Sequence, residues 1–159
     1  MAVGFERAFP GASPEQIESV EAELGVELPG DYRRFLERTG GGYLEANFLP
    51  PEADASVRYL YSPGPNDDDH IFDLVTAARF YAPDSPSDPE IDADYLPIGE
   101  DDGDNVICLK VRGGDRGAVY FWAHDAFANT DPFERLADSF EEFFERLRPI
   151  DELESGPLA

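Results

Sequence analysis

The stretch that decides the fold is Leu28-Pro29-Gly30-Asp31-Tyr32-Arg33-Arg34-Phe35-Leu36, which is followed by the triplet Gly40-Gly41-Gly42. Proline suits the start of a helix, because its fixed φ is helical and its missing N–H is not needed in the first turn. Tyr32, Phe35 and Leu36 recur at spacings of three and four residues, so they fall on one side of that helix. The glycines predict its end. The stretch therefore predicts a short amphipathic helix with its apolar side on a core.

A second helix is predicted immediately before this one. Ser13-Pro14-Glu15-Gln16 combines a capping serine, a proline in the first turn and a glutamine three residues after the serine, which is a capping-box pattern. Ile17, Val20 and Leu24 then share one side, and Gly25 is placed to end the helix.

The part that follows the glycines is rich in β-forming residues. Strand-like runs cover 43–49, 57–61, 95–98, 106–111 and 118–122. A helix with an apolar side of Ile71, Leu74, Val75 and Ala78 lies among them, and one of the aspartates at 67–69 is predicted to cap it. Gly113 to Gly117 predicts a hairpin turn between the last two strands.

The chain is predicted to close with helix. Asp131 to Glu134 could cap a brief helical turn. Ser139 begins a stronger capping box, and Phe140, Phe143, Phe144 and Leu147 line the buried side of a final helix that Pro149 ends. Helices near both ends with consecutive strands between them predict an α+β fold.

Length and composition indicate one domain. With 159 residues, 42% of them apolar, the chain can bury a core. We expect a domain over 1–149, an exposed loop over 83–94 and a flexible tail over 150–159. The single cysteine, Cys108, lies in an apolar run and is expected to be a buried hydrophobe. Without a signal peptide or an apolar stretch of about 20 residues, the sequence predicts a cytoplasmic protein.

Charge is the most unusual feature of the composition. The formal net charge is −23, and eleven of the twelve basic residues are arginine. Such a surface repels nucleic acid and anionic membranes, and it attracts basic partners. Two other origins remain open, because a high-salt cytoplasm selects acidic proteins and a GC-rich genome favours arginine over lysine.

The sequence contains little that points to catalysis. The familiar nucleotide-binding, hydrolase and zinc motifs are absent, and there are two histidines, His70 and His124. His124 precedes Asp125 at a strand end, where a hydrogen-bonded structural role is expected. The runs Asp67–Asp69 and Glu100–Asp104 contain carboxylates that suit calcium or magnesium, but neither follows the EF-hand pattern. We expect no metal and no cofactor.

The assembled motifs resemble the signature of the SUKH superfamily, which includes the fungal cell-wall assembly regulator and bacterial immunity proteins. The resemblance covers residues 13–148 in four segments. The residues that carry it are Leu28, Pro29, Asp31, Tyr32, Phe35, Gly40, Gly41, Ile98, Gly99, Gly103, Trp122, Ser139, Phe140 and Phe143. It implies a single bent, mainly antiparallel sheet flanked by helices and no catalytic residues. It also implies a protein that binds and neutralises a toxin, often a nuclease or deaminase.

The leading hypothesis is therefore a non-enzymatic immunity protein with a basic toxin domain as partner. The alternatives are a regulatory scaffold module and a metal-dependent or acid-dependent enzyme, which would need His124 within reach of a carboxylate cluster. We expect the partner at two acidic loops and at the aromatic residues on their margins. These residues are Asp67, Asp68, Asp69, Glu100, Asp101, Asp102, Asp104, Tyr61 and Tyr95.

Overall fold

The fold is α+β, as predicted. The computed structural model describes residues 3–50, 55–68, 70–83, 91–125 and 131–150. Within them, seven antiparallel strands form one sheet, and two short strands form a second. The order in the large sheet is β1 (Phe5–Pro10), β2 (Thr39–Leu44), β4 (Tyr59–Leu60), β5 (Tyr95–Glu100), β6 (Val106–Lys110), β7 (Val119–Trp122) and β8 (Phe133–Ala137). The small sheet pairs β3 (Asn47–Phe48) with β9 (Arg148–Pro149).

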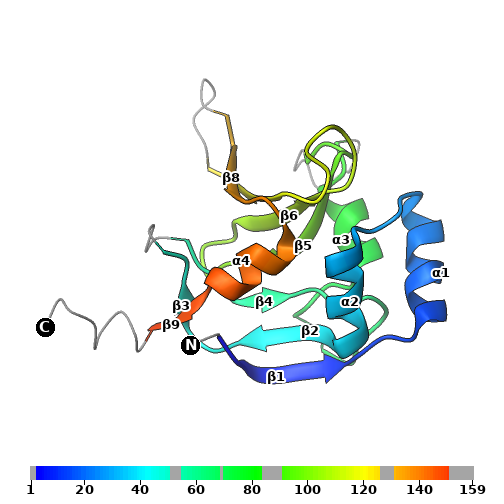
Figure 1. Ribbon diagram of the computed structural model, residues 1–159, viewed down its shortest axis with the longest axis horizontal. Helices are drawn as coiled ribbons and strands as arrows, with labels where there is room; N and C mark the ends of the chain where they lie inside the picture. The colour runs from blue at the N-terminus through cyan, green and yellow to red at the C-terminus, as the bar shows by residue number, and fades with distance from the viewer. Residues whose placement is uncertain (1–2, 51–54, 69, 84–90, 126–130, 151–159) are drawn as a thin grey trace, which may run out of the picture.

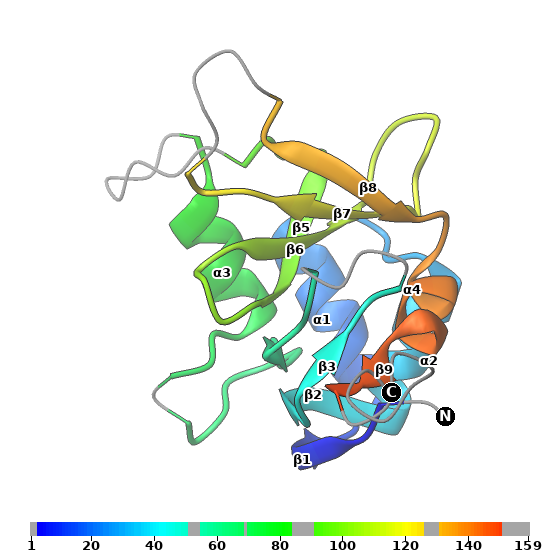
Figure 2. The same cartoon turned by 90° about the vertical axis from the view of Figure 1, so that its left-hand side faces the viewer.

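The large sheet is bent, and the helices gather beside it. Strands at its two ends run in clearly different directions (Figure 2). Helices α1 (Pro14–Leu24), α2 (Gly30–Arg38) and α3 (Leu74–Tyr81) lie together at one side, and α4 (Phe140–Arg146) crosses in front (Figure 1). Helix α4 contacts α2 and β8, and α3 contacts β5. The amino-terminal and carboxyl-terminal halves are therefore joined by helix packing as well as by the sheet.

The helix starts predicted at Ser13 and Ser139 are confirmed. Ser13 Oγ accepts a hydrogen bond from Gln16 N at 3.2 Å, and Gln16 Oε1 accepts one from Ser13 N at 2.8 Å, which makes a complete capping box. Gly25 ends α1 with φ of 70°. Ser139 Oγ accepts from Glu142 N at 3.1 Å and begins α4. Asp31 connects the two helical regions, because its Oδ2 accepts from Glu141 N at 2.9 Å.

One core contains the apolar residues that the sequence pattern selected. Phe35, Ile98, Trp122, Phe140 and Phe143 are all buried and belong to the same cluster. Central strand β6 is buried on both faces. Its Cys108 is fully buried, and burial raises the pKa of the thiol, so it is a buried hydrophobe as expected. Leu28 and Tyr32 of the deciding stretch are also buried.

Gly40, Gly41 and Gly42 do not end α2, and that prediction was wrong. Helix α2 ends at Arg38, and the glycines lie inside β2. A Cβ on Gly41 would lie 2.6 Å from the Leu60 carbonyl oxygen, and its φ is +83°. Glycine is therefore needed here for the close approach of neighbouring strands. Gly99 has the same role in β5, since a Cβ there would lie 2.6 Å from the Tyr59 carbonyl oxygen.

Three other local predictions were also wrong. Residues 131–134 lead into strand β8 and form no helix, because Phe133 and its neighbours pair with β7. Asp73, rather than an aspartate at 67 or 68, caps α3 by accepting from Thr76 N; Asp69 lies outside the described residues. Pro149 does not end α4, which stops at Arg146; it belongs to β9, and Leu147 is the C-cap. Residues 84–90 of the expected loop and 151–159 of the expected tail also lie outside the described ranges.

Candidate partner-binding site

The first acidic turn is held in place by an arginine from the edge strand. Arg7 in β1 pairs with Asp67 Oδ1 at 3.1 Å and with Asp68 Oδ2 at 2.9 Å. Asp68 Oδ1 also accepts from His70 N at 2.7 Å, and this hydrogen bond is the main cause of the lowered pKa of Asp68. Asp67 remains exposed to solvent.

The second acidic turn connects β5 and β6, and its aspartates have two roles. Asp101 Oδ1 accepts from the backbone N of both Gly103 and Asn105 at 2.8 Å, so Asp101 is buried and holds the turn. Asp102 and Asp104 are exposed. Asp104 has a φ of 66°, a left-handed conformation that aspartate tolerates better than most residues. Two of the expected carboxylates are thus available to a partner here.

Glu100 and Tyr61, which we expected to meet the partner, are both buried. Glu100 is the last residue of β5 rather than part of a loop, and it is 9% exposed. Tyr61 is fully buried, and its hydroxyl donates a hydrogen bond to Glu100 Oε2 at 2.7 Å. Tyr95 lies elsewhere, stacked on Phe133 with ring centres 3.9 Å apart. The structure therefore does not bring Tyr95 to the acidic turns.

Both acidic turns border one hollow, which we call the aromatic pocket. His70 follows the first turn, Asp104 belongs to the second, and both line this hollow of about 370 Å³. The described residues that line it are Tyr59, His70, Phe72, Phe80, Tyr81, Glu100, Asp104, Trp122 and His124. The ends of β5, β7 and α3 supply Glu100, Trp122, Phe80 and Tyr81, and β4 and the connecting segments supply the rest, so the pocket forms where separate elements converge.

Aromatic rings form the walls of the pocket in an almost continuous series. Ring centres lie 5.2 Å apart for Phe72 and Phe80, 4.9 Å for Phe80 and Tyr81, and 6.2 Å for Tyr81 and Trp122. Phe80 is 38% exposed, the only large apolar side chain in the described ranges that is classed as exposed. Trp122 is the single tryptophan of the chain. Walls of this composition are typical of the anchor points of protein interfaces.

Glu100 lies against the aromatic wall and is surrounded by tyrosine hydroxyls. Its cross-strand neighbour is Tyr59. Tyr61 donates to Glu100 Oε2 as described, and Tyr81 donates to the same oxygen at 3.5 Å. Burial is the main cause of the raised pKa of all three tyrosines, and the nearby Glu100 carboxylate raises it further. These phenols therefore stay neutral and can donate.

No cation accompanies the Glu100 carboxylate within the described parts of the chain. The ion pairs found there connect other residues, and none includes Glu100. Arg58, the arginine next to Tyr59 in sequence, pairs instead with Asp102 at 3.6 Å. Buried carboxylates are normally paired or fully hydrogen-bonded. Among the described residues, the hydrogen bonds to the Glu100 carboxylate thus come from phenols, and no ion pair accompanies them.

The two histidines lie at the same pocket. His124 is held at the end of β7 by Asn105, with its Nδ1 2.9 Å from Asn105 Oδ1, so the hydrogen-bonded role expected at a strand end is confirmed. His124 lines the same hollow as Glu100 and Asp104, the carboxylates that the enzymatic hypothesis would need near it. The described lining residues include no serine, threonine or cysteine that could act as a nucleophile.

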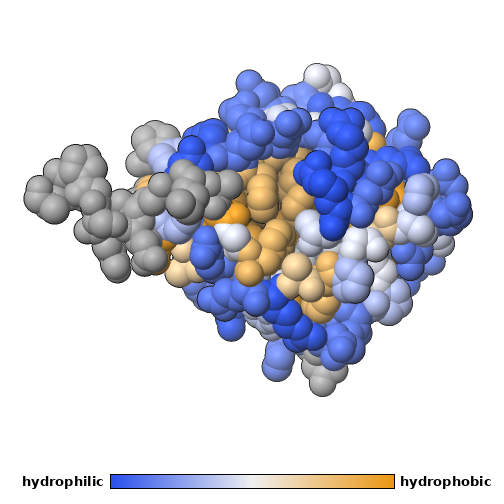
Figure 3. All heavy atoms as spheres, turned by 60° about the horizontal axis from the view of Figure 1, so that its bottom comes forward, coloured by the Kyte–Doolittle hydropathy of each residue, from blue (hydrophilic) through white to orange (hydrophobic). Residues whose placement is uncertain are grey.

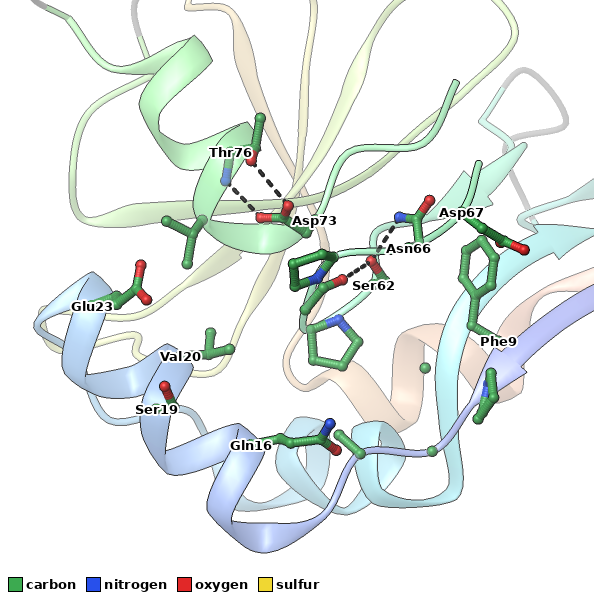
Figure 4. Close-up of a pocket in the computed structure, with 18 of the residues that line it drawn as sticks. Phe9, Gln16, Ser19, Val20, Glu23, Ser62, Asn66, Asp67, Asp73 and Thr76 are labelled. Atoms are coloured by element: carbon green, nitrogen blue, oxygen red, sulfur yellow. Dashed lines mark hydrogen bonds between the residues drawn. The ribbon is translucent and has the colours of Figure 1, made fainter. Parts of the chain in front are cut away.

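A larger hollow of about 660 Å³ lies between α1, α3 and the turn at 62–67 (Figure 4). Its polar groups have structural partners. Asp73 accepts from the backbone N and the hydroxyl of Thr76, Asn66 donates to Ser62 Oγ at 2.8 Å, and Glu23 pairs with Arg79. Because these groups satisfy one another, this hollow is less suited to bind a charged ligand than the aromatic pocket.

The described residues form neither a membrane-spanning helix nor a metal-binding cluster. Across residues 3–50, 55–68, 70–83, 91–125 and 131–150, no helix has both the length and the apolarity needed to cross a bilayer. The same residues include no group of three His, Cys, Asp or Glu side chains placed to hold a metal ion.

On the face that contains β1, apolar side chains gather in the middle and hydrophilic ones surround them (Figure 3).

Sequence reasoning missed most of the aromatic pocket. Trp122 was expected to be core, and it is both a core residue and a pocket wall. One local signal was present, because Tyr59 and Tyr61 are two residues apart in a strand and must share a face. Their meeting with Tyr81 and Glu100 depends on strand order and helix placement, for which no local pattern exists.

Comparison with known proteins agrees with the fold. Residues 11–146 match the sequence model of the SMI1 / KNR4 family (SUKH-1). The SPbeta prophage-derived uncharacterized protein YokK of Bacillus subtilis (strain 168) is 31% identical over 147 residues. That alignment covers 81% of this chain and 71% of YokK.

Proposed function

The chain belongs to the SMI1/KNR4 family (SUKH-1), and from this premise we propose that it is a non-catalytic immunity protein that binds a basic toxin domain and blocks its working surface. Family membership supports a role in binding, and the resemblance of the motifs to bacterial immunity proteins supports a toxin as the partner. The proposed place of action is the cytoplasm.

The observation that carries this proposal is the lining of the aromatic pocket, which includes His70 after the first acidic turn and Asp104 of the second. Interfaces commonly have an aromatic centre that is shielded from water and a charged rim. Here Phe80 and Trp122 supply the centre, and Asp104 and its neighbour Asp102 supply exposed negative charge beside it. Asp67 is exposed in the first turn, three residues before the pocket residue His70. A surface of this kind suits a partner with positive charge around an anchoring side chain.

The chemistry of nucleic-acid enzymes explains why such a partner would be basic. A nuclease or a nucleic-acid deaminase must carry a positive surface to hold phosphates. An inhibitor that presents carboxylates to that surface competes with the substrate and associates rapidly. The net charge of −23 strengthens long-range attraction in the same direction.

Co-expression with the product of the adjacent gene, followed by pull-down of the complex, is the direct test. We expect a stable complex and loss of the toxin's activity within it. A complex with a protein that has no toxic activity would support the scaffold alternative. Turnover of nucleotide or ester substrates by the purified chain alone would support the enzymatic alternative and contradict the proposal.

The role of the acidic rim can be tested by association kinetics. The triple variant Asp67→Asn, Asp102→Asn, Asp104→Asn should associate severalfold more slowly at low salt, with a smaller difference above about 0.5 M salt, where charges are screened within a few ångströms. The matched control, Glu37→Gln, Glu141→Gln, Glu145→Gln, removes the same charge from the exposed faces of α2 and α4. If both triple variants slow association equally, the acidity acts only as a background charge, and this rim is not the interface.

A further inference from the structure

We propose that the aromatic pocket accepts the cationic side chain, arginine or lysine, of a partner protein that docks beside the acidic turns. This inference rests on the proposed function as a binding protein and adds the chemistry of the group that anchors the partner. Three observations support it: the buried carboxylate, the aromatic walls and a second cluster in the same chain.

The buried carboxylate is the first. Glu100 is 9% exposed, lines the pocket and has only phenol donors as hydrogen-bonding neighbours in the described residues. Removing a carboxylate from water is unfavourable unless a positive charge accompanies it. In the free protein this unfavourable term is already present. A cation that enters the pocket therefore gains the attraction of Glu100 without a new desolvation of the carboxylate.

The walls are the second observation. Cations are attracted to the faces of aromatic rings, most strongly to tryptophan and tyrosine, at distances up to about 6 Å. Tyr59, Tyr81 and Trp122 line the pocket together with Glu100. A hollow of about 370 Å³ is large enough for a guanidinium group with its methylene chain. An apolar partner group would fit the rings but would leave the carboxylate without a counter-charge.

The third observation is that this chain already surrounds a cation in the same way. The ammonium of Lys110 lies 4.3 Å from the centre of the Tyr95 ring and 5.8 Å from that of Tyr120. Asp115 Oδ1 lies 3.5 Å from the same Nζ. Two tyrosine rings and one carboxylate thus hold an ammonium group inside this fold. In the aromatic pocket the equivalent groups are present, and the described residues that line it include no arginine or lysine.

Fluorescence of the single tryptophan provides the test, because Trp122 lines the pocket. The probes are N-acetyl-arginine amide, N-acetyl-lysine amide and the neutral isostere N-acetyl-citrulline amide, each titrated to about 100 mM at constant ionic strength. We expect a saturable change with the arginine or the lysine probe and at least tenfold weaker binding of citrulline. Equal binding of citrulline and arginine would overturn the proposal.

Variants of pocket residues test whether the arginine probe binds in the aromatic pocket. Glu100→Gln should weaken binding of the arginine probe at least tenfold, whereas Glu37→Gln, which removes one charge from the exposed face of α2, should change it less than twofold. If Glu100→Gln does not fold, Tyr59→Leu replaces it, since Tyr59 is only partly buried and its loss removes one wall. If folded Glu100→Gln or Tyr59→Leu binds the arginine probe as well as the wild type does, the aromatic pocket is not the binding site.

The toxin complex separates this inference from the proposed function. If the partner binds the wild type and binds Glu100→Gln or Tyr59→Leu equally well, the cation pocket is wrong and the immunity role stands. If the adjacent gene product does not bind but the arginine probe enters the pocket, the pocket stands and the proposed partner is wrong.

Discussion

Two regions of this molecule use the same chemistry in different ways. The Lys110 cluster, formed by Lys110, Tyr95, Tyr120 and Asp115, encloses the only lysine of the chain, whose side chain is 15% exposed. The aromatic pocket likewise combines tyrosine rings with a carboxylate, but Glu100 has no cation there among the described residues. We call the Lys110 cluster the complete region, because it contains its own cation, and the aromatic pocket the incomplete region, because the described residues place no arginine or lysine in it.

This difference indicates that the Lys110 cluster serves the stability of the fold and that the aromatic pocket serves binding. A cluster that includes its own counter-ion contributes to folding, and it has little left to offer a partner. A cluster without a counter-ion contributes less to folding, and it retains an interaction that only another molecule can complete. Binding sites are commonly less stable than the rest of a fold for this reason. The comparison therefore predicts opposite responses to mutation in the two regions.

The largest expected effect tests whether both regions depend on one core. Phe143 in α4 is 1% exposed, and its ring centre lies 6.2 Å from that of Phe140. Phe143→Ala should lower the free energy of unfolding by about 3–5 kcal/mol, because it leaves a cavity in the core. Urea unfolding, followed by tryptophan fluorescence and by far-UV circular dichroism, should give one coincident transition. A loss below about 1 kcal/mol would mean that α4 does not pack as described.

A smaller loss is expected when the complete region is broken. Lys110→Met keeps the length of the side chain but removes the charge between the two rings and Asp115. The free energy of unfolding should fall by about 1 kcal/mol, the size of a partly buried cation–π interaction. Affinity for the toxin partner should stay within twofold of wild type. A large loss of affinity together with unchanged stability would reverse the roles of the two regions.

Glu100→Gln should change stability less than Lys110→Met does. The glutamine oxygen can still accept from Tyr61, so the loss of a charge-assisted hydrogen bond is offset by removal of a buried charge that has no counter-ion. We expect a free energy of unfolding within about 0.5 kcal/mol of wild type and much weaker binding of the partner. A loss of 2 kcal/mol or more would show that Glu100 serves the fold rather than a partner.

The sequence predicted much of the fold because its strongest patterns are local. The capping box at Ser13 and the spacing of Phe140 and Phe143 depend on neighbouring residues, and the structure confirms them. The Gly40–Gly42 triplet was misassigned because glycine allows either a helix end or a close strand contact, and only the neighbouring strand decides between them. Strand β1 escaped notice because bulges interrupt its pairing with β2 and hide the alternation of side chains.

The site was less predictable than the fold. Acidic runs are visible in any sequence, so Asp67 and Asp102 to Asp104 could be proposed from composition alone. The burial of Tyr61 and Glu100 follows from the order β2-β4-β5, which places Tyr59 opposite Glu100. The pocket joins residues 59 to 124, and their contact depends on long-range pairing that no local spacing records.

The smallest expected effect is a change in the dependence of stability on pH, and it concerns the complete region alone. The hydroxyl of Tyr120, which donates to Asp115, is the main cause of the lowered pKa of Asp115, and Lys110 lowers it further. A carboxyl group whose pKa is lower in the folded state stabilises the fold above its unfolded pKa of about 3.9, and this stabilisation is lost as the pH falls through the folded value. Asp115→Asn should therefore reduce the loss of stability below about pH 4.

Urea midpoints between pH 2 and pH 7 would measure this change. In Asp115→Asn the urea midpoint should still fall with pH, but less steeply than in wild type. Some dependence remains because the pKa of Asp68 is also lowered, so Asp68 loses its stabilising charge in the same pH window. Asp68→Asn is thus the matched control, and the double variant should have the flattest curve. If Asp115→Asn gives a curve parallel to wild type, the Asp115 carboxylate does not contribute to the Lys110 cluster in solution. In that case the Lys110 cluster would not stabilise the fold in the way proposed, and the contrast with the aromatic pocket would no longer hold.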